Sequence, residues 1–424
     1  MLGEIISIGS ELLVGSHPET NSLFLAEKLA EKGVRVRWKT IVGDVRDDIA
    51  FSLHQAIGRA DLVILTGGLG STVDDCTREV VAEVTGRPLR RRTKAYELLR
   101  SRYDSYGRTL TASLLRQATI PIKAEMLENP VGTALGFLVT HRGRLIVALP
   151  GVPSEAKAMF EEHVAPKLDK HLKQSHVLNR QVFQTFGLTE TEIDDRVKPV
   201  FETSPSITIG LLASPLGVSV TLSEWSPFPG IRPKGNQAQT SVKFDNAAAL
   251  VRSCLGEYVY AEGSRTMEEV VGQYLLSHGL TLAVAESCTG GLIGHRLTQV
   301  PGSSGYLDRA LVCYSNRAKQ ELLAVPNYLL RRFGAVSSLV ARAMARGVRK
   351  KSHTVLGLAV TGIAGPGGGS PQKPVGLVYV GMDGPDGTKV QKFLFHGDRH
   401  SIKIRASQAA LAILREYLLH KKWK

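Results

Sequence analysis

The chain of 424 residues contains no apolar run near the roughly 18 residues that a membrane-spanning helix needs. Its first residues, 1–6, do not combine a basic region with a long apolar one, so we predict no signal peptide. Only four cysteines are present, and none belongs to a C-x-x-C pair. This spacing argues against a zinc site and a disulfide framework, and it predicts a protein of the reducing cytoplasm without a membrane partner.

Aromatic residues make up only 6% of the chain, and of the local basic runs only the one at 421–424 contains one, Trp423. The net charge of +14 nevertheless attracts polyanions. The basic residues are largely dispersed, with short local runs at 90–92, 349–351 and 421–424. This pattern argues against nucleic acid and favours solvated surfaces that attract phosphate-bearing small molecules. A DNA-associated protein remains the alternative, and steep salt-dependent binding to duplex DNA would support it.

Three segments are predicted, and all three are α/β. Residues 1–170 alternate apolar strands with helical patterns, which predicts a doubly wound domain around a parallel sheet. Residues 171–262 predict a small α/β module without a catalytic constellation, either a spacer or a dimerisation unit. Residues 263–424 predict a further α/β domain, whose first helix begins with a capping box at Thr266 and Glu269.

Glycines follow the continuous apolar strand at 61–66. Ligands of open parallel sheets bind beyond the carboxyl ends of strands, and Gly67, Gly68 and Gly70 let the backbone direct N–H groups at phosphate. Two acidic residues come next, at the start of a predicted helix. They either complement the helix dipole or bind a hard cation such as Mg²⁺; these residues are Asp74 and Asp75.

A predicted hairpin, 136–140 with 145–149, runs into a second loop of this kind at 150–155. This loop also follows a strand end, so we expect it to line the same cleft. We interpret Glu155 as an acid in the first turn of the following helix, with cation binding as the alternative.

The last segment is organised around residues 285–291, which read Ala-Glu-Ser-Cys-Thr-Gly-Gly. An apolar strand precedes them and a helical pattern follows. This arrangement presents the Ser287 hydroxyl at a helix start, where unpaired N–H groups can hold an oxyanion. Our hypothesis is that Ser287 is the nucleophile of an amidase, and the alternative is a capped turn without chemistry.

Amide hydrolysis also needs a base. No histidine lies in a glycine-rich loop of this segment, which argues against a Ser-His-Asp triad. Lys319, beyond a strand end, is the candidate base if desolvation lowers its pKa, with Tyr314 as a proton relay. The alternative is a solvated lysine. Cys288 is the rival nucleophile, but without a partnered base it is better explained as an inert buried thiol.

The motifs at 8–13, 66–75 and 150–155 resemble the CinA family, whose first domain is related to the molybdopterin-binding domains of molybdenum-cofactor biosynthesis. The resemblance implies an ADP-ribose pyrophosphatase with a divalent cation, Mg²⁺ or Co²⁺, and K⁺ as a further candidate. One departure is Ser71, where the family usually has proline; it leaves the loop less rigid. The implied nucleotide-binding residues are Glu11, Asn21, Gly67, Gly68, Gly70, Thr72, Pro150 and Gly151, and the implied metal ligands are Asp44, Asp74, Asp75 and Glu155.

The stretches at 285–291, 314–319, 334–337, 361–366 and 397–399 resemble the CinA C-terminal domain, a nicotinamide mononucleotide deamidase. The resemblance implies a Ser287–Lys319 pair that needs no metal. Where the family often has another arginine, this chain has Lys403, with Arg405 as the alternative phosphate contact. The implied substrate-binding residues are Glu286, Thr289, Gly290, Gly291, Thr361, Gly362, Ala364, Gly365, Arg399 and Lys403.

The resemblance therefore implies a homodimeric enzyme of pyridine nucleotide salvage. It would convert nicotinamide mononucleotide to nicotinic acid mononucleotide and ammonia, and cleave ADP-ribose at a second, metal-dependent site. The alternative is that only the first domain is an enzyme and the last is a nucleotide-binding module.

Overall fold

The computed structural model describes residues 1–72, 74–105, 107, 114–171, 176–227 and 238–421. The chain divides into two compact units. One is Met1–Asn179 with Trp225–Thr240, and the other is Arg180–Glu224 with Ser241–Lys424. Of the helices in the described ranges, none has both the length and the apolar character needed to cross a membrane.

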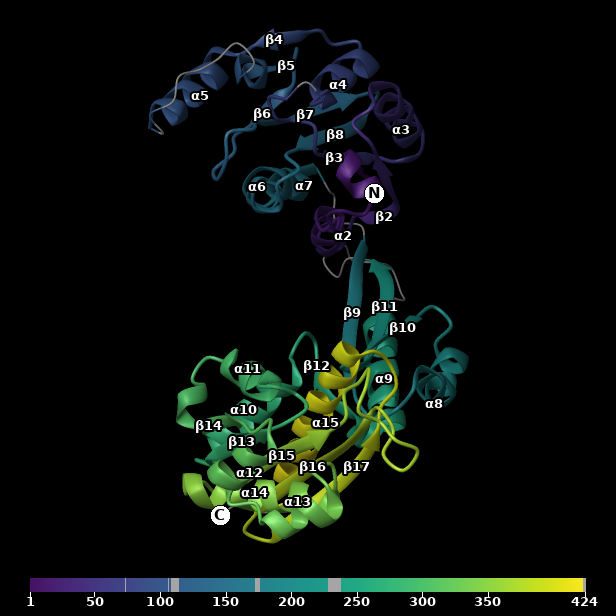
Figure 1. Ribbon diagram of the computed structural model, residues 1–424. Helices are drawn as coiled ribbons and strands as arrows, with labels where there is room; N and C mark the ends of the chain where they lie inside the picture. The colour runs from purple at the N-terminus through teal and green to yellow at the C-terminus, as the bar shows by residue number, and fades with distance from the viewer. Residues whose placement is uncertain (73, 106, 108–113, 172–175, 228–237, 422–424) are drawn as a thin grey trace. The chain divides into compact units, whose positions relative to one another are not determined.

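The first unit is built on a six-stranded sheet with the order β2-β1-β3-β8-β7-β6 (Figure 1). Its first four strands are parallel, and β7 and β6 are antiparallel. Every residue of β3 is buried, as predicted for an apolar strand covered on both faces. The strands are β1 (Leu2–Ile8), β2 (Arg35–Val42), β3 (Leu62–Thr66), β6 (Glu125–Leu127), β7 (Gly136–His141) and β8 (Arg144–Leu149).

Helices cover both faces of this sheet, which confirms the doubly wound prediction. One core includes Leu53 of α3 and Val80 of α4, and the opposite core includes Leu25 of α2 and Met159 of α6. A short antiparallel pair joins β4 (Leu89–Arg91) and β5 (Thr119–Pro121). The helices are α1 (Ser10–Leu13), α2 (Asn21–Glu31), α3 (Arg46–Arg59), α4 (Thr77–Thr85), α5 (Thr93–Ser105), η1 (Leu114–Ala118), α6 (Pro153–Met159), η2 (Phe160–Val164) and α7 (Ala165–His171).

The second unit contains two sheets, each with its own core. The first is a four-stranded sheet with the order β10-β11-β9-β12, which packs on α8 and α9. Helix α8 begins with a capping box, in which Thr189 and Glu192 bond reciprocally. The elements are β9 (His176–Thr185), α8 (Glu190–Thr203), β10 (Thr208–Ser214), β11 (Gly217–Pro227), α9 (Ala238–Leu255), η3 (Gly256–Tyr258) and β12 (Val259–Glu262).

The other sheet of the second unit has the order β14-β13-β15-β16-β17. Strands β14, β13 and β15 are parallel to one another. β16 pairs antiparallel with β15, and β17 pairs antiparallel with β16. α10 and α15 cover one face and α14 the other (Figure 1). The elements are α10 (Met267–Ser277), β13 (Leu282–Glu286), α11 (Leu292–Thr298), η4 (Ser303–Gly305), β14 (Leu307–Val312), α12 (Asn316–Leu323), α13 (Asn327–Phe333), α14 (Ser338–Ser352), β15 (Leu356–Gly362), β16 (Leu377–Gly384), β17 (Gly387–Leu394) and α15 (Arg399–His420).

The parallel strands of this last domain determine where its loops meet. Because β13, β14 and β15 run in the same direction, the segments that follow them emerge at one edge of the sheet. These segments begin at Ser287, Cys313 and Ile363. The predicted capping box at the start of α10 is also confirmed, with Thr266 and Glu269 bonded reciprocally.

Candidate active site

Ser287 follows β13 directly and remains attached to the sheet. Its N–H donates a hydrogen bond to the Val360 carbonyl at 3.0 Å, and its side chain is only 8% exposed. The chain then turns sharply, and the Gly290 N–H donates to the Ser287 carbonyl at 3.2 Å. Gly290 and Gly291 have φ values of 63° and 96°, which favour glycine. The turn therefore places the hydroxyl at the end of a buried strand, where it is largely shielded from solvent.

Lys319 lies in the first turns of α12, and the structure brings its amine to Ser287. The cap of this helix is Ser315, whose hydroxyl accepts from the Ala318 N–H at 3.0 Å. The Lys319 Nζ lies 3.1 Å from Ser287 Oγ, and the lysine is 1% exposed. The same Nζ donates to the carbonyls of Cys313 at 2.8 Å and Tyr314 at 3.1 Å. The interpretation of Lys319 as a solvated surface lysine is therefore wrong.

Burial controls the charge of both reactive candidates. Desolvation lowers the pKa of Lys319, because a buried ammonium loses its hydration and, among the described residues, no carboxylate pairs with it. Desolvation has the opposite effect on the Cys288 thiol, whose pKa it raises to about 12. A thiol with that pKa is neutral at physiological pH and is a poor nucleophile. The electrostatics therefore favour Ser287 over Cys288.

Glu286 has a different position from the one expected of a substrate-binding residue. It is fully buried, and its carboxylate accepts hydrogen bonds from the N–H groups of Gly291 at 3.0 Å, Ile293 at 3.1 Å and Gly294 at 2.8 Å. The N–H groups of Gly291, which caps α11, and of Ile293 and Gly294 in its first turn thus bind an anion of the protein itself. These three donors are occupied and do not face an oxyanion, and the observed role of Glu286 is to fix the turn that carries Ser287.

We expect Glu286→Gln to destabilise the protein by about 2 kcal/mol, because the amide group faces donors that it cannot satisfy. Differential scanning calorimetry of the intact chain measures the change as a lower melting temperature. The matched control is Glu321→Gln on α12, an exposed carboxylate paired only with Arg317. An exposed pair of this kind contributes well under about 1 kcal/mol. Equal melting temperatures for the two variants would contradict the role given to Glu286.

Tyr314 and Arg399 meet at the rim of the site. Arg399 donates to the Tyr314 hydroxyl at 3.0 Å and to the Gly365 carbonyl at 2.6 Å. The Tyr314 side chain is 60% exposed, and it is the backbone carbonyl of Tyr314, not its hydroxyl, that contacts Lys319. This placement does not support the proton-relay role predicted for Tyr314. It makes Tyr314 a partner that orients Arg399.

Two further polar groups face the turn after Ser287. A Cβ placed on Gly290 would lie 3.5 Å from the Lys403 Nζ, so Lys403 approaches this turn. Arg399 and Lys403 are four residues apart on α15, hence on one face of that helix. Thr289 is fully buried, and its hydroxyl has no hydrogen-bond partner among the described residues. Of the two alternatives for the phosphate contact, Lys403 rather than Arg405 is thus seen beside the site.

The glycine-rich loop after β15 contributes mainly backbone. Thr361 is buried and donates its hydroxyl to the Ala335 carbonyl at 2.9 Å, so the side chain ties this loop to the start of α14. A Cβ on Gly362 would lie 2.7 Å from the Val378 side chain, which explains the glycine by close packing. Ala364 is buried in the core, whereas Gly365 presents the carbonyl that Arg399 binds.

In the first unit, the two predicted glycine loops touch. A Cβ placed on Gly151 would lie 3.4 Å from the Cα of Gly67. The Asn21 side-chain nitrogen donates to the Gly151 carbonyl at 2.7 Å, and its Oδ1 is buried without a partner among the described residues. The other predicted nucleotide-binding residues lie in these loops or just after β1; they are Glu11, Gly68, Gly70, Thr72 and Pro150.

The predicted metal ligands are not gathered into a ligand set. Asp44 accepts a hydrogen bond from the first N–H of α1, Asp75 from a loop N–H, and Glu155 from an asparagine side chain. Within the described ranges, no three His, Cys, Asp or Glu side chains are placed to hold one metal ion. The helix predicted to begin at Asp74 and Asp75 begins instead at Thr77. This arrangement does not fit a preformed cation site, and no step below depends on a metal.

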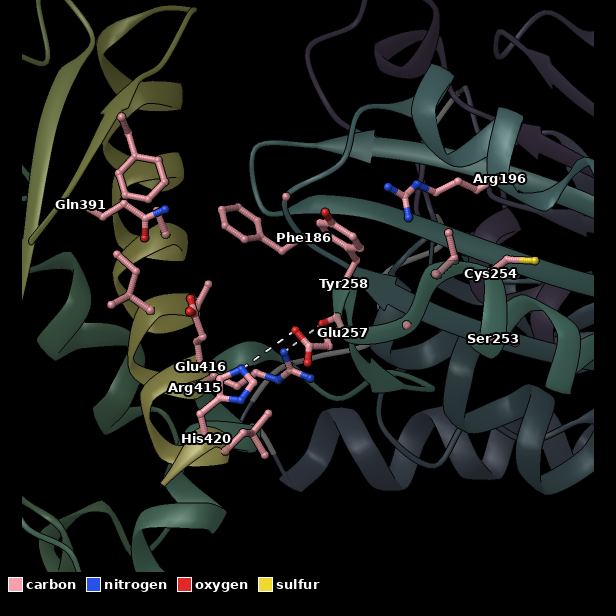
Figure 2. A pocket seen from close by; sticks show the side chains of 18 residues that line it. Phe186, Arg196, Ser253, Cys254, Glu257, Tyr258, Gln391, Arg415, Glu416 and His420 are labelled. Carbon is pink, nitrogen blue, oxygen red and sulfur yellow. Dashed lines mark hydrogen bonds and ion pairs between the residues drawn. The ribbon is translucent and has the colours of Figure 1, made fainter. Parts of the chain in front are cut away.

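A cavity of about 900 Å³ lies elsewhere in the second unit, between the end of α9 and the face of α15 (Figure 2). One end is closed by Arg415, whose guanidinium donates to the carbonyls of Glu257 at 3.1 Å and Val259 at 2.9 Å. None of the 18 side chains drawn in Figure 2 belongs to the predicted sites. The cavity therefore does not contain the Ser287–Lys319 pair.

Comparison with known proteins agrees with this arrangement of domains. The model of the CinA C-terminal domain family matches residues 264–418, and that of the probable molybdopterin binding domain matches residues 4–170. A solved structure of a CinA protein with unknown function from Thermoplasma acidophilum is 34% identical. It covers 39% of this chain and 97% of its own, with a TM-score of 0.37.

Two curated relatives match along almost the whole chain. A CinA-like protein from Acidobacterium capsulatum is 41% identical over 424 residues, covering 99% of this chain and 100% of that protein. A CinA-like protein from Geotalea uraniireducens is 40% identical over 415 residues, covering 98% and 97%. With both domain models in place and full-length relatives at this identity, the chain belongs to the CinA family.

Proposed function

We propose that the last domain is an amidase that hydrolyses the carboxamide of nicotinamide mononucleotide, with Ser287 as nucleophile and Lys319 as base. The observation that carries this proposal is the environment of the Lys319 amine. The amine is buried, has a lowered pKa, and contacts two backbone carbonyls and the Ser287 hydroxyl.

These three contacts match the needs of a neutral amine. A neutral lysine has two N–H donors and one lone pair. The carbonyls of Cys313 and Tyr314 are acceptors only, so they take the two N–H groups. The lone pair then faces Ser287 Oγ at 3.1 Å, and the hydroxyl can turn its hydrogen toward the nitrogen. The protein thus supplies a base that is already oriented toward the proton that it removes.

The reaction follows from this arrangement. Lys319 takes the Ser287 proton as Oγ bonds to the carboxamide carbon, and the ammonium then protonates the departing nitrogen, which leaves as ammonia. The product is an ester between Ser287 and the nicotinoyl group. Water attacks that ester while Lys319 accepts one of its protons, and return of that proton to Ser287 Oγ releases nicotinic acid mononucleotide.

Arg399 and Lys403 supply the positive charge for the 5′-phosphate of this substrate. Both lie on the face of α15 next to the site, and a guanidinium fork suits phosphate. We expect Arg399→Ala to raise KM for nicotinamide mononucleotide about tenfold to a hundredfold, with a smaller change in kcat. Steady-state kinetics provide the measurement. Arg346→Ala, an exposed cation on α14, is the control, and an equal KM shift in both variants would contradict the assignment.

The decisive experiment is release of ammonia from nicotinamide mononucleotide by the intact chain, with nicotinic acid mononucleotide identified as the second product. Rapid quenching followed by mass spectrometry is expected to show the nicotinoyl ester on the peptide that contains Ser287. If the chain binds the nucleotide but releases no ammonia, the last domain is a nucleotide-binding module and the amidase proposal fails.

A second proposal concerns the first unit, where the contact between the two glycine loops is the favouring observation. The loops follow β3 and β8 at the carboxyl edge of the sheet, and the unpaired Asn21 Oδ1 lies beside them. We propose that this edge binds the diphosphate of ADP-ribose. Cleavage with Mg²⁺ or Co²⁺ remains a prediction, to be tested by release of AMP with and without added cation.

A further inference from the structure

Arg78 is a buried cation beneath the first glycine loop, at a position that no motif of the sequence marks. The residue lies in the first turn of α4 and is 1% exposed. Its guanidinium donates to the carbonyls of Leu69 and, at 3.2 Å, Gly70. Its Nε is buried and has no partner among the described residues. Burial lowers the pKa of Arg78 to about 10, so the group stays charged at neutral pH.

The charges around Arg78 do not neutralise it by direct contact. The nearest acidic neighbour along the helix, Glu79, forms an ion pair with Arg116 at 3.0 Å. The Asp75 carboxylate lies against Gly70 and accepts the Thr72 N–H at 2.9 Å. In the described part of the loop, the carboxylates therefore serve other donors, while Arg78 is bonded only to carbonyl oxygens.

Because the peptide group is planar, these two contacts determine where the N–H groups of the loop point. In a trans peptide, the C=O of one residue and the N–H of the next point in opposite directions. The Leu69 and Gly70 carbonyls point inward to a buried guanidinium, so the N–H groups of Gly70 and Ser71 point away from the core. No described residue accepts a hydrogen bond from either N–H. Outward N–H groups above a buried positive charge form a site for an oxyanion.

We propose that Arg78 is a positioning residue that turns the Gly70 and Ser71 N–H groups toward the diphosphate of a bound nucleotide. Ser71 supplies the second donor in this arrangement, and proline, the usual residue of the family at this position, would not supply it. The inference rests on the nucleotide-binding role proposed for the first unit. It adds to that role an oxyanion subsite of two adjacent backbone donors, with the cation that orients them.

Two substitutions at Ser71 separate the backbone donor from the side chain. Ser71→Ala removes the hydroxyl and keeps the N–H, whereas Ser71→Pro removes the N–H. The φ of Ser71 is not positive, so this residue does not have to leave a left-handed conformation to accommodate proline. We expect Ser71→Ala to bind inorganic pyrophosphate and ADP-ribose as wild type does, and Ser71→Pro to bind both about tenfold or more weakly.

Isothermal titration of the intact chain with pyrophosphate and ADP-ribose measures these affinities. Residues 70–78 belong to the first unit, so a thermal unfolding transition of that unit equal to wild type verifies that each variant is folded. Arg78→Met and Arg78→Lys form a second pair, for which amide shifts of ¹⁵N-labelled glycine and serine report whether the Gly70 and Ser71 N–H groups still respond to pyrophosphate. A role in packing alone would change stability without abolishing that response, whereas we expect the response to be lost in Arg78→Met and partly kept in Arg78→Lys.

The outcomes distinguish the oxyanion subsite from nucleotide binding by the first unit as a whole. Equal affinities of Ser71→Ala and Ser71→Pro, with wild type binding normally, would overturn the subsite and leave nucleotide binding intact. Absence of binding by wild type to both probes would overturn nucleotide binding by the first unit and the subsite with it. Weak binding by Ser71→Pro alone is the result that supports the inference.

Discussion

Ser287→Ala is expected to lower kcat for ammonia release from nicotinamide mononucleotide by about 10⁴-fold or more, the scale on which removal of an activated serine abolishes acyl transfer. The hydroxyl is the atom that bonds to the carboxamide carbon, and the 3.1 Å contact with Lys319 is its only observed link to a base. KM is expected to change little, because the hydrogen bonds of Arg399 go to Gly365 and Tyr314 and so do not depend on the Ser287 hydroxyl.

The control for this variant is the neighbouring residue. Cys288→Ala removes a buried thiol whose pKa is raised to about 12, so we expect kcat to fall less than about tenfold. Mass spectrometry of quenched reactions gives a second measurement, since the acyl adduct should disappear in Ser287→Ala and persist in Cys288→Ala. The reverse result, with the adduct lost only in the cysteine variant, would make Cys288 the nucleophile.

The strands that organise both sites were predictable because their composition is locally unambiguous. β3 and β13 are short apolar runs, each buried along its whole length. Capping boxes at Thr189 and Thr266 were equally accessible, since the pattern depends on residues only three positions apart. The first residue of helix α4 was harder to predict, because acidic residues just before Thr77 complement the helix dipole as well as acidic residues inside the first turn do.

The meeting of Ser287 and Lys319 depends on a contact between residues 32 positions apart. Adjacent parallel strands end at one edge, so the sequence allowed the expectation that the loops after β13 and β14 converge. It could not give side-chain direction. Glu286 precedes the nucleophile and resembles a substrate ligand in sequence, yet its carboxylate bends back to the N–H groups of Gly291 and of two residues in the first turn of α11.

Tyr314 and Arg78 illustrate the same limit in different ways. Tyr314 was correctly placed beside Lys319 along the chain, but the contact is made by its carbonyl, and the hydroxyl is 3.0 Å from Arg399. Which of the two groups faces the site is decided by the turn into α12, not by the residue type. Arg78 looks like an ordinary surface arginine in a helix, and only the fold shows it to be 1% exposed.

Lys319→Met is expected to lower kcat by about 10²- to 10⁴-fold, the usual contribution of a general base. The wild-type pH profile provides an independent test. Desolvation depresses the pKa of Lys319 below the usual value of about 10.4. The competent form is the neutral amine, so kcat/KM rises tenfold per pH unit below that pKa and levels off above it. This rising limb is expected to disappear from the residual activity of Lys319→Met.

Lys319→Arg is the matched variant, because it keeps a positive charge at the site but cannot give up its proton in this pH range. If Lys319 acts as a base, the arginine variant is as inactive as the methionine variant at every pH between about 6 and 10. If the lysine acts instead as a fixed cation that stabilises negative charge, Lys319→Arg retains much of the activity and Lys319→Met does not. A fall in wild-type kcat/KM with rising pH, over the range where a rise is expected, would likewise show that the protonated amine is required. The Lys319 Nζ would then be an ammonium that donates to three acceptors, namely the Cys313 and Tyr314 carbonyls and Ser287 Oγ.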